Sequence, residues 1–346
     1  MSEPRKVAPP IVRRAHQIAD DVLFPAANTV DETGQVPAGH WDLLAREGFY
    51  GLAAGFGAQE LDFAEVVEVL EALSGGCLST TFTWMQHNGA VLNLGGSGNT
   101  ALRERHFEDL VAGRTRAGVA FAGVIPNPPR LWARAVEGGY LLEGEAPFVS
   151  GWGVIDLLQV SGRDRDSGET GTIVSGLIDA RPGDGLTAEP VRLVAGQATN
   201  TVRLRFDGYL LPTDQITGTV PHADFLAYQA FGSRLNGCVA CGIAHRAIRL
   251  LAEAGHPEAA TALTARLDHV RSALDAGLHD PATMPSARAG AAELALRAAG
   301  ALVAGVGGPA LLIGQHAQRL VREATFTMVA ASRPDMRQHL VRSLTG

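Results

Sequence analysis

Residues 117–218 carry the feature that most constrains the fold. Short runs of Val, Leu, Ile, Phe and Thr recur there at regular spacing, with Gly, Asp and Pro between them. This pattern is typical of antiparallel strands joined by turns. Gly138 and Gly139 tolerate the positive φ of a hairpin turn, and Tyr140 and Leu142 continue the alternation beyond it. On both sides of this stretch apolar residues recur every three or four positions, so the predicted order is helical, β, helical.

The two changes of spacing predict an α+β multidomain protein. We expect an N-terminal all-α domain over residues 1–117, an antiparallel β-barrel-like domain over 118–221 and a C-terminal four-helix bundle over 222–346. The first domain should hold helices over residues 12–23, 37–48, 63–76, 78–94 and 100–111. The bundle helices are predicted over residues 238–251, 259–278, 287–306 and 315–328.

Charge and cysteine content exclude several classes of function. The chain has 29 Lys and Arg against 36 Asp and Glu, and no basic stripe, which argues against a nucleic-acid partner. Three cysteines give no disulfide framework, the N-terminus has no apolar signal core, and we therefore expect a cytoplasmic protein. The apolar residues 298–314 are interrupted by Gly and Pro, so they predict a buried helix-turn-helix edge and no membrane span. Cys238 and Cys241 lack a second pair, so we expect packing there and no metal site.

Several segments resemble the acyl-CoA dehydrogenase family in order and in spacing. They are residues 31–37, 41–52, 69–73, 139–144, 148–151, 155–156 and 211–218. The resemblance covers nearly the whole chain. It implies FAD held in a groove between the β-domain and the bundle, at a subunit interface, and removal of a proton and a hydride from the Cα–Cβ bond of an acyl-CoA thioester in lipid metabolism.

Carried over by position, the resemblance places Phe148 and Ser150 against the flavin ring, with the Ser hydroxyl near the reactive nitrogen. Residues 121–126, which include Phe121 and Val124, would supply backbone groups to the pyrimidine edge. Ser150 can also be interpreted as a turn residue that closes a strand.

The family's catalytic groups are absent from their usual positions. Arg322-Glu-Ala is present, but the Glu expected downstream falls at Ala331, and the alternative base position falls at about Gly232. Neither side chain can abstract a proton. The family's Arg-x-x-Phe-Gly sequence is missing after Gly255, and Ala304 stands where a Gln is expected. These losses should fall on one surface and make FAD binding weak or dependent on a partner chain.

Other residues remain as candidates for the base or for substrate contacts. Glu323 is nearest to the expected loop, although a Glu beside Arg322 is more often a solvated surface charge. Asp335 and His339 lie on the following segment. His87 is placed with Trp84 and Gln86 where the family's substrate pocket takes helix residues, and its pKa would suit acid–base work. A satisfied polar residue of the pocket is the other interpretation.

Positive charge at the start of the bundle is the remaining candidate. Arg234 and Asn236 are expected to precede the first bundle helix, where they could meet an anionic CoA, or simply cap the helix.

Three functions follow from these residues. The first is a FAD-dependent oxidoreductase acting on the CH–CH group of an acyl thioester or a related substrate. The others are a catalytically silent subunit that pairs with a homologous chain, and a flavin-dependent monooxygenase of the same fold. The apolar bundle predicts an oligomer, whether of identical chains or with a homologous subunit.

Overall fold

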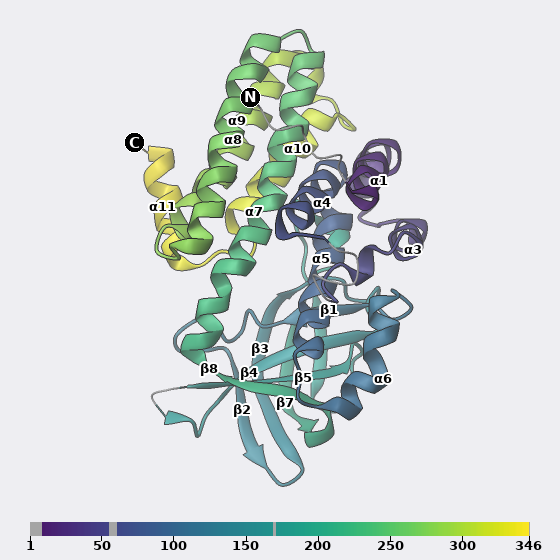
Figure 1. The fold of residues 1–346 in the computed structure, drawn as a ribbon, viewed down its shortest axis with the longest axis vertical. Helices are drawn as coiled ribbons and strands as arrows, with labels where there is room; N and C mark the ends of the chain where they lie inside the picture. The colour runs from purple at the N-terminus through teal and green to yellow at the C-terminus, as the bar shows by residue number, and fades with distance from the viewer. Residues whose placement is uncertain (1–8, 55–60, 169–170, 346) are drawn as a thin grey trace.

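The computed structural model describes residues 9–54, 61–168 and 171–345, and it consists of a helical part, a β-sheet and a second helical part. The sheet lies at one end of the molecule and the C-terminal helices at the other, with the N-terminal helices beside them (Figure 1). The predicted fold class is confirmed. The N-terminal helices are α1 (Pro10–Ile18), a π-helical segment (Ala19–Leu23), α2 (Phe24–Thr33), α3 (Ala38–Arg46), α4 (Phe63–Gly76), α5 (Leu78–Gly95) and α6 (Thr100–Val111).

Local sequence signals set the ends of these helices. Asp62 caps α4 in a capping box with Glu65, since the Asp62 side chain accepts from the Glu65 amide and the Glu65 side chain accepts from the Asp62 amide. Gly34 directly after α2, and Gly48 two residues after α3, take left-handed backbone, where a residue with a Cβ would be strained. Asn99 caps α6 and also donates to the Asp214 and Ile216 carbonyls. The glycine-rich loop before α6 therefore docks this helix onto the sheet.

The middle of the chain forms one eight-stranded sheet in the order β6-β7-β3-β2-β4-β5-β8, with β1 paired to β4. The strands are β1 (Ala117–Ala120), β2 (Leu131–Val136), β3 (Gly139–Val149), β4 (Leu157–Asp164), β5 (Thr172–Asp179), β6 (Leu186–Pro190), β7 (Val202–Pro212) and β8 (Ile216–Pro221). Most pairs are antiparallel, as predicted, but β1 and β2 both pair with β4 in parallel. The predicted hairpin forms between β2 and β3, with its turn at Glu137 and Gly138, one residue earlier than expected.

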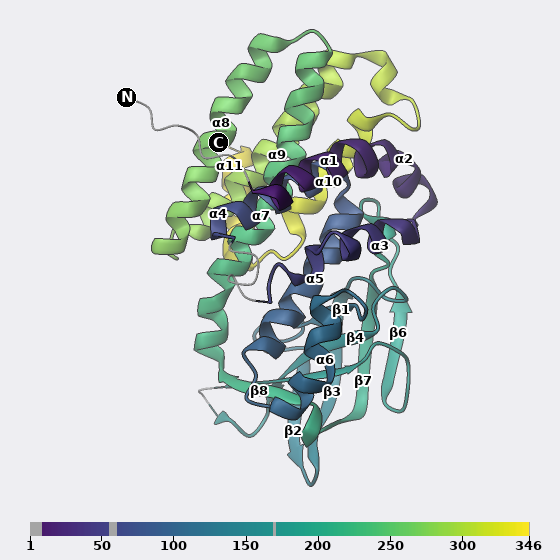
Figure 2. The same cartoon turned by 45° about the vertical axis from the view of Figure 1, so that its right-hand side comes forward.

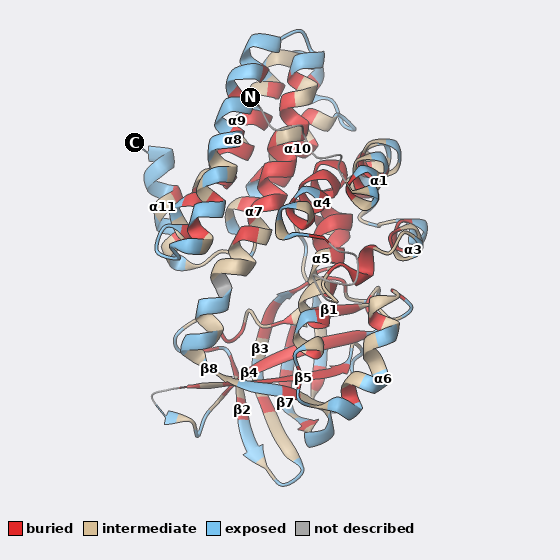
Figure 3. Ribbon diagram, in the orientation of Figure 1, coloured by how far each residue is buried: buried red, intermediate tan, exposed pale blue. Residues whose placement is uncertain are grey.

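The C-terminal part contains α7 (His222–Glu253), α8 (Pro257–His279), α9 (Met284–Val306), α10 (His316–Val329) and α11 (Pro334–Thr345). The four predicted bundle helices are present, and α11 adds a fifth that packs on α9. The prediction that α7 begins near Cys238 is wrong, because the helix begins 16 residues earlier, at His222. Its first turns carry exposed and half-buried residues and connect the sheet to the bundle (Figure 3). Phe225 and Phe231 in these turns pack against Phe121 and Phe63.

Close backbone packing joins the first and last parts of the molecule. A Cβ on Gly242 of α7 would lie 2.3 Å from the Glu71 carbonyl oxygen of α4, so only glycine allows this crossing. Turned by 45°, the structure shows α2 beside α10 (Figure 2), where Arg319 donates to Asn28 at 3.1 Å. Among the described residues, α9 is the one helix long and apolar enough to cross a membrane, and here it packs against α7, α8 and α10 within the bundle.

Candidate flavin site

The end of β3 lies where all three parts of the molecule meet. A Cβ on Gly151 would lie 3.3 Å from the Thr83 methyl group of α5. The ring of Phe82, also on α5, stacks edge-on against Phe326 of α10, with centroids 4.9 Å apart. A Cβ on Gly196 would lie 3.2 Å from the Phe326 ring. These five residues define a three-domain junction beside the positions predicted to contact flavin.

Phe148 is held in a strained and exposed position at this end of β3. The pairing of β3 with β7 is irregular between Ala146 and Val149, and Phe148 takes a φ of 55° there. Its side chain is 66% exposed, whereas its neighbours Val149 and Ser150 are buried. Left-handed backbone at a bulky residue costs roughly 1–3 kcal/mol and clusters at functional sites. An exposed phenyl ring fixed in this way fits the flat apolar face of a flavin ring.

Ser150 ends a chain of buried hydroxyl groups. Its Oγ lies 3.0 Å from Thr201 Oγ1, which lies 2.7 Å from Thr199 Oγ1, and Thr199 donates to the Gly196 carbonyl oxygen at 2.7 Å. The backbone holds the same arrangement, because the Gly151 amide donates to the Thr199 carbonyl at 2.7 Å. Ser150 therefore follows the end of a strand, as predicted, and its hydroxyl has a specific hydrogen-bond partner in Thr201.

The loop that includes Phe121 and Val124 is tied to the start of α7. Arg163 of β4 donates to the Val124 carbonyl at 2.8 Å and to His222 Nε2 at 2.6 Å. Burial, and secondarily Arg163, lower the pKa of His222. Phe121 is half-buried, with its ring centroid 6.2 Å from that of Phe225. Val124 is fully buried and its amide donates to the Phe121 carbonyl, so it shapes the loop and offers no free amide to a ligand.

The candidates on α5 are mainly structural. Both ring nitrogens of His87 are used within the fold: Nε2 donates to the Leu110 carbonyl at 3.1 Å, and Nδ1 accepts from the Ala117 amide at 3.0 Å. Burial lowers its pKa to about 4. Trp84 is buried against Phe49, and Gln86 donates to a carbonyl of its own helix. The alternative interpretation of His87, a satisfied buried residue, is the one that these contacts support.

Arg234 and Asn236 lie inside α7 and do not precede it, so the prediction of a positive helix start is wrong. Arg234 is 2% exposed, and its Nε donates to Asp275 of α8 at 2.6 Å. Asn236 donates to the Gly232 carbonyl at 2.8 Å, on the preceding turn of the same helix. Arg234 thus joins α7 to α8, whereas the Asn236 bond lies within α7. The early start of α7 is the reason, since it carries these residues twelve or more positions past the helix N-terminus.

The turn after α10 carries no acidic side chain at the expected base position. Ala331 is exposed with a φ of 50°, and the turn is held by buried Arg288, which donates to the Thr327 carbonyl at 3.0 Å. Asp335 accepts from Arg333 at 2.8 Å at the start of α11, and His339 lies within that helix.

Glu323 is buried, which corrects its interpretation as a surface charge. Its side chain accepts from Arg319 at 2.7 Å, and Oε2 has no hydrogen-bond partner among the residues that the structure describes. Burial raises the pKa of this carboxyl. Glu323 was misjudged because Arg319, one turn earlier on α10, pairs with it inside the protein, while Arg322 pairs with Asp31.

The two altered interface positions lie together. His256, in the turn where the Arg-x-x-Phe-Gly sequence is missing, has Nε2 3.3 Å from the carbonyl of Gly305, which follows Ala304. Beyond α9, Leu311, Leu312 and Ile313 are exposed and line a hollow of about 330 Å³ with residues of α2 and α10. We name these three residues the apolar loop.

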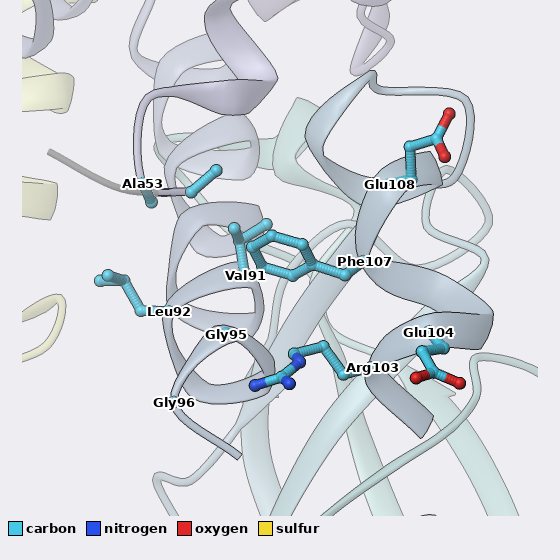
Figure 4. Close-up of a pocket in the computed structure, with 10 residues that line it drawn as sticks. Ala53, Val91, Leu92, Gly95, Gly96, Arg103, Glu104, Phe107 and Glu108 are labelled. Atoms are coloured by element: carbon cyan, nitrogen blue, oxygen red, sulfur yellow. The ribbon is translucent and has the colours of Figure 1, made fainter. Parts of the chain in front are cut away.

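A separate hollow of about 650 Å³ lies between α5 and α6 (Figure 4). It is lined by Val91, Phe107 and Arg103 among others, and none of the predicted site residues is part of it. The residues of the three-domain junction lie elsewhere.

The sequence alone did not single out Thr199, Thr201, Phe82 or Phe326. Thr201 faces Ser150 because β3 pairs with β7 in a register that sets Val149 opposite Val202. The two segments are 51 residues apart along the chain. No local pattern in either segment indicates that register.

Comparisons with known proteins agree with this architecture. The family described as acyl-CoA dehydrogenase, N-terminal domain, matches residues 10–114. No curated protein matches the sequence. The butyryl-CoA dehydrogenase of Megasphaera elsdenii has the same fold, with a TM-score of 0.84 at 17% identity and with 100% of each chain covered.

Two further structures share the fold. PigA with FAD and proline has a TM-score of 0.83 at 20% identity, with 99% of each chain covered. The nitrososynthase of Micromonospora carbonacea var. africana has a TM-score of 0.79 at 21% identity, with 99% of this chain and 98% of that chain covered. Residues 10–114 thus match the N-terminal domain of the acyl-CoA dehydrogenase family, and the chain has the fold of these three structures over its whole length.

Proposed function

We propose that the protein is a FAD-dependent oxidoreductase that acts on the CH–CH group of an acyl thioester or a related substrate. The observation that carries this proposal is the pair Phe148 and Ser150: an exposed ring in strained backbone beside a buried, ordered hydroxyl. They lie at the three-domain junction, and PigA, a protein of the same fold, has been observed with FAD. Bound FAD would supply an acceptor for a hydride.

The protein's own residues would hold the flavin ring and exclude water from it. Phe148 would stack on the ring, and Ser150 would face its reactive nitrogen. Phe82 and Phe326, which pack edge-on against each other at the junction, would help to exclude water. Water-free surroundings strengthen each polar contact made there, because the local dielectric is low.

Proton removal is where this chain departs from an ordinary dehydrogenase. Ala331 has no acidic group, Gly232 has no side chain, and Glu323 is paired with Arg319. A positioned general base contributes about 10²- to 10⁴-fold to such a reaction. We therefore expect slow dehydrogenation of ordinary acyl-CoAs, and a substrate that loses its proton more readily.

Ala331 also favours a second candidate, a flavin-dependent monooxygenase, because oxygen transfer through a flavin needs no carboxylate beside the substrate. The nitrososynthase with the same fold supports keeping this candidate. The silent subunit remains a third proposal. The exposed apolar loop supports an oligomer, either of identical chains or with a homologous subunit. The three free cysteines are buried, which is compatible with the proposed cytoplasmic location.

Flavin binding and turnover can be tested separately. The purified chain is titrated with FAD, and the loaded protein is mixed anaerobically with a panel of acyl-CoAs while bleaching of the flavin band is followed. The missing Arg-x-x-Phe-Gly sequence and the missing Gln at Ala304 remove two contacts to FAD. If both contacts are charge-assisted, their loss would raise the dissociation constant of FAD about a hundredfold. Slow bleaching by ordinary acyl-CoAs, with faster bleaching by those whose α-proton is more acidic, supports the proposal, and a chain that binds no FAD at any concentration contradicts it. Oxygen consumption with reduced flavin and a panel of amines and thioesters would favour the monooxygenase.

A further inference from the structure

We propose that Thr199 and Thr201 fix the direction of the Ser150 hydroxyl hydrogen, so that Ser150 offers a bound flavin only lone pairs and favours its reduced form. This inference rests on the proposed function, since it needs a flavin against Ser150. It assigns a positioning role to two threonines that would not touch the flavin themselves.

The direction of each hydrogen follows from counting donors along the chain of hydroxyls. A carbonyl oxygen only accepts, so the 2.7 Å contact between Thr199 and the Gly196 carbonyl uses the single hydrogen of Thr199. The 2.7 Å contact between Thr199 and Thr201 must then use the hydrogen of Thr201. The 3.0 Å contact between Thr201 and Ser150 can only use the hydrogen of Ser150.

Burial and backbone geometry keep this order in place. Thr199, Thr201 and Ser150 are at most 5% exposed, so bulk water offers no competing partners. The Thr199 amide donates to the same Gly196 carbonyl at 2.9 Å, which fixes the start of the chain. The Gly151 amide holds the other end through the Thr199 carbonyl. An alternative order would leave two of these oxygens in contact, at 2.7 or 3.0 Å, with no hydrogen between them.

The consequence depends on the oxidation state of the flavin. The reactive nitrogen of an oxidised flavin accepts hydrogen bonds, whereas in the reduced flavin it carries a hydrogen and donates. A Ser150 hydroxyl whose hydrogen points to Thr201 can accept from the reduced form and cannot donate to the oxidised form. Ser150 thus stabilises reduced FAD relative to oxidised FAD and raises the reduction potential.

Two substitutions remove the restraint without changing Ser150. Thr201→Val deletes the acceptor of the Ser150 hydrogen and keeps the branched side chain that packs there. Thr199→Val deletes the acceptor of the Thr201 hydrogen. Thr201 can then donate to Ser150, and the hydrogen of Ser150 becomes free to turn elsewhere. In both variants Ser150 gains the freedom to donate to oxidised FAD. A group that only supported the fold would instead weaken both forms of FAD alike.

The experiment measures, at saturating FAD, the midpoint potential of the bound cofactor against a redox dye, together with the dissociation constant of oxidised FAD. We expect both threonine variants to lower, about three- to tenfold, the ratio of the dissociation constant of oxidised FAD to that of reduced FAD. Tenfold corresponds to a fall of about 30 mV for a two-electron couple. The matched control is Ser175→Ala, which breaks another buried hydroxyl pair, 2.8 Å from Ser161 in the same sheet, and should leave the potential unchanged.

A double-mutant cycle shows whether the effect passes through Ser150. In a Ser150→Ala background, Thr201→Val should no longer change the potential. Circular dichroism identifies any variant that does not fold, and the second threonine variant then carries the test. If wild-type protein binds FAD and both variants keep its potential, the inference is overturned while the proposed function stands. If wild-type protein binds no FAD, both are overturned.

Discussion

Acidification below pH 6.5 is expected to destabilise the fold through His87. The imidazole is 1% exposed, with Nε2 donating to Leu110 and Nδ1 accepting from the Ala117 amide. A proton on Nδ1 would face the hydrogen of that amide, and burial lowers the pKa of His87 from 6.5 to about 4. The unfolded chain therefore takes up this proton first as the pH falls.

The sign and the size of the pH effect on stability follow from the lowered pKa of His87. The stability that a neutral His87 contributes is complete above pH 6.5 and is lost as the pH falls toward 4, because the unfolded state binds more protons in that window. The full difference is about 3 kcal/mol, of which about 2 kcal/mol is lost between pH 8 and pH 5. Burial also lowers the pKa of His245 and of His316 to about 4, so these two residues lose stability in the same direction as His87.

Urea unfolding at pH 8 and pH 5 isolates the contribution of His87 when it is compared with His87→Gln. The glutamine amide keeps one donor and one acceptor but takes up no proton, so the variant should lose about 2 kcal/mol less than wild type over this interval. Equal denaturant slopes in the two proteins are the control that their unfolding is comparable. Identical pH dependence in both would refute this account of His87.

Three other substitutions test the packing, the assembly and the missing base. Gly242→Ala should cost about 1–3 kcal/mol in thermal or urea unfolding, because its Cβ would lie 2.3 Å from the Glu71 carbonyl oxygen; an unchanged stability would contradict this crossing. The wild-type chain should sediment as an oligomer at micromolar concentration. Ile313→Asp, in the apolar loop, should shift the sedimenting mass toward the 36.3 kDa of one chain. A wild-type monomer would contradict the interface. Ala331→Glu should speed anaerobic flavin bleaching by acyl-CoA by about 10²-fold or more, and rapid bleaching by the wild-type protein would show that another residue acts as the base.

Much of the fold could be predicted because its signals are local. Helices α5 and α6 follow from apolar spacing and from the loop that ends in Asn99, and α4 ends at the double glycine that marks it in the sequence. The sheet was recognisable from its alternation and turns. The start of α7 was not predicted, although its first turns contain Phe225, Leu226 and Phe231, because these side chains are only half-buried between the sheet and the bundle.

The site was only partly predictable because its key contacts join distant segments. Phe148 and Ser150 were found from one short motif, but the partner of Ser150 depends on how β3 pairs with β7. Glu323 was interpreted wrongly for a similar reason, because only tertiary packing decides whether a charged residue in a helix faces water or, as here, is buried beside an ion-pair partner.

The most direct test of the proposed function is a titration of the purified chain with FAD, followed by the visible flavin band and by calorimetry. We expect saturable binding of about one FAD per chain, weakened about tenfold by Phe148→Ala because the stacking surface is lost. The matched control Val341→Ala, which removes an equally exposed apolar side chain from α11, should leave the affinity unchanged. Absence of saturable binding, or equal affinity in wild type and Phe148→Ala, would contradict a flavin site at the end of β3.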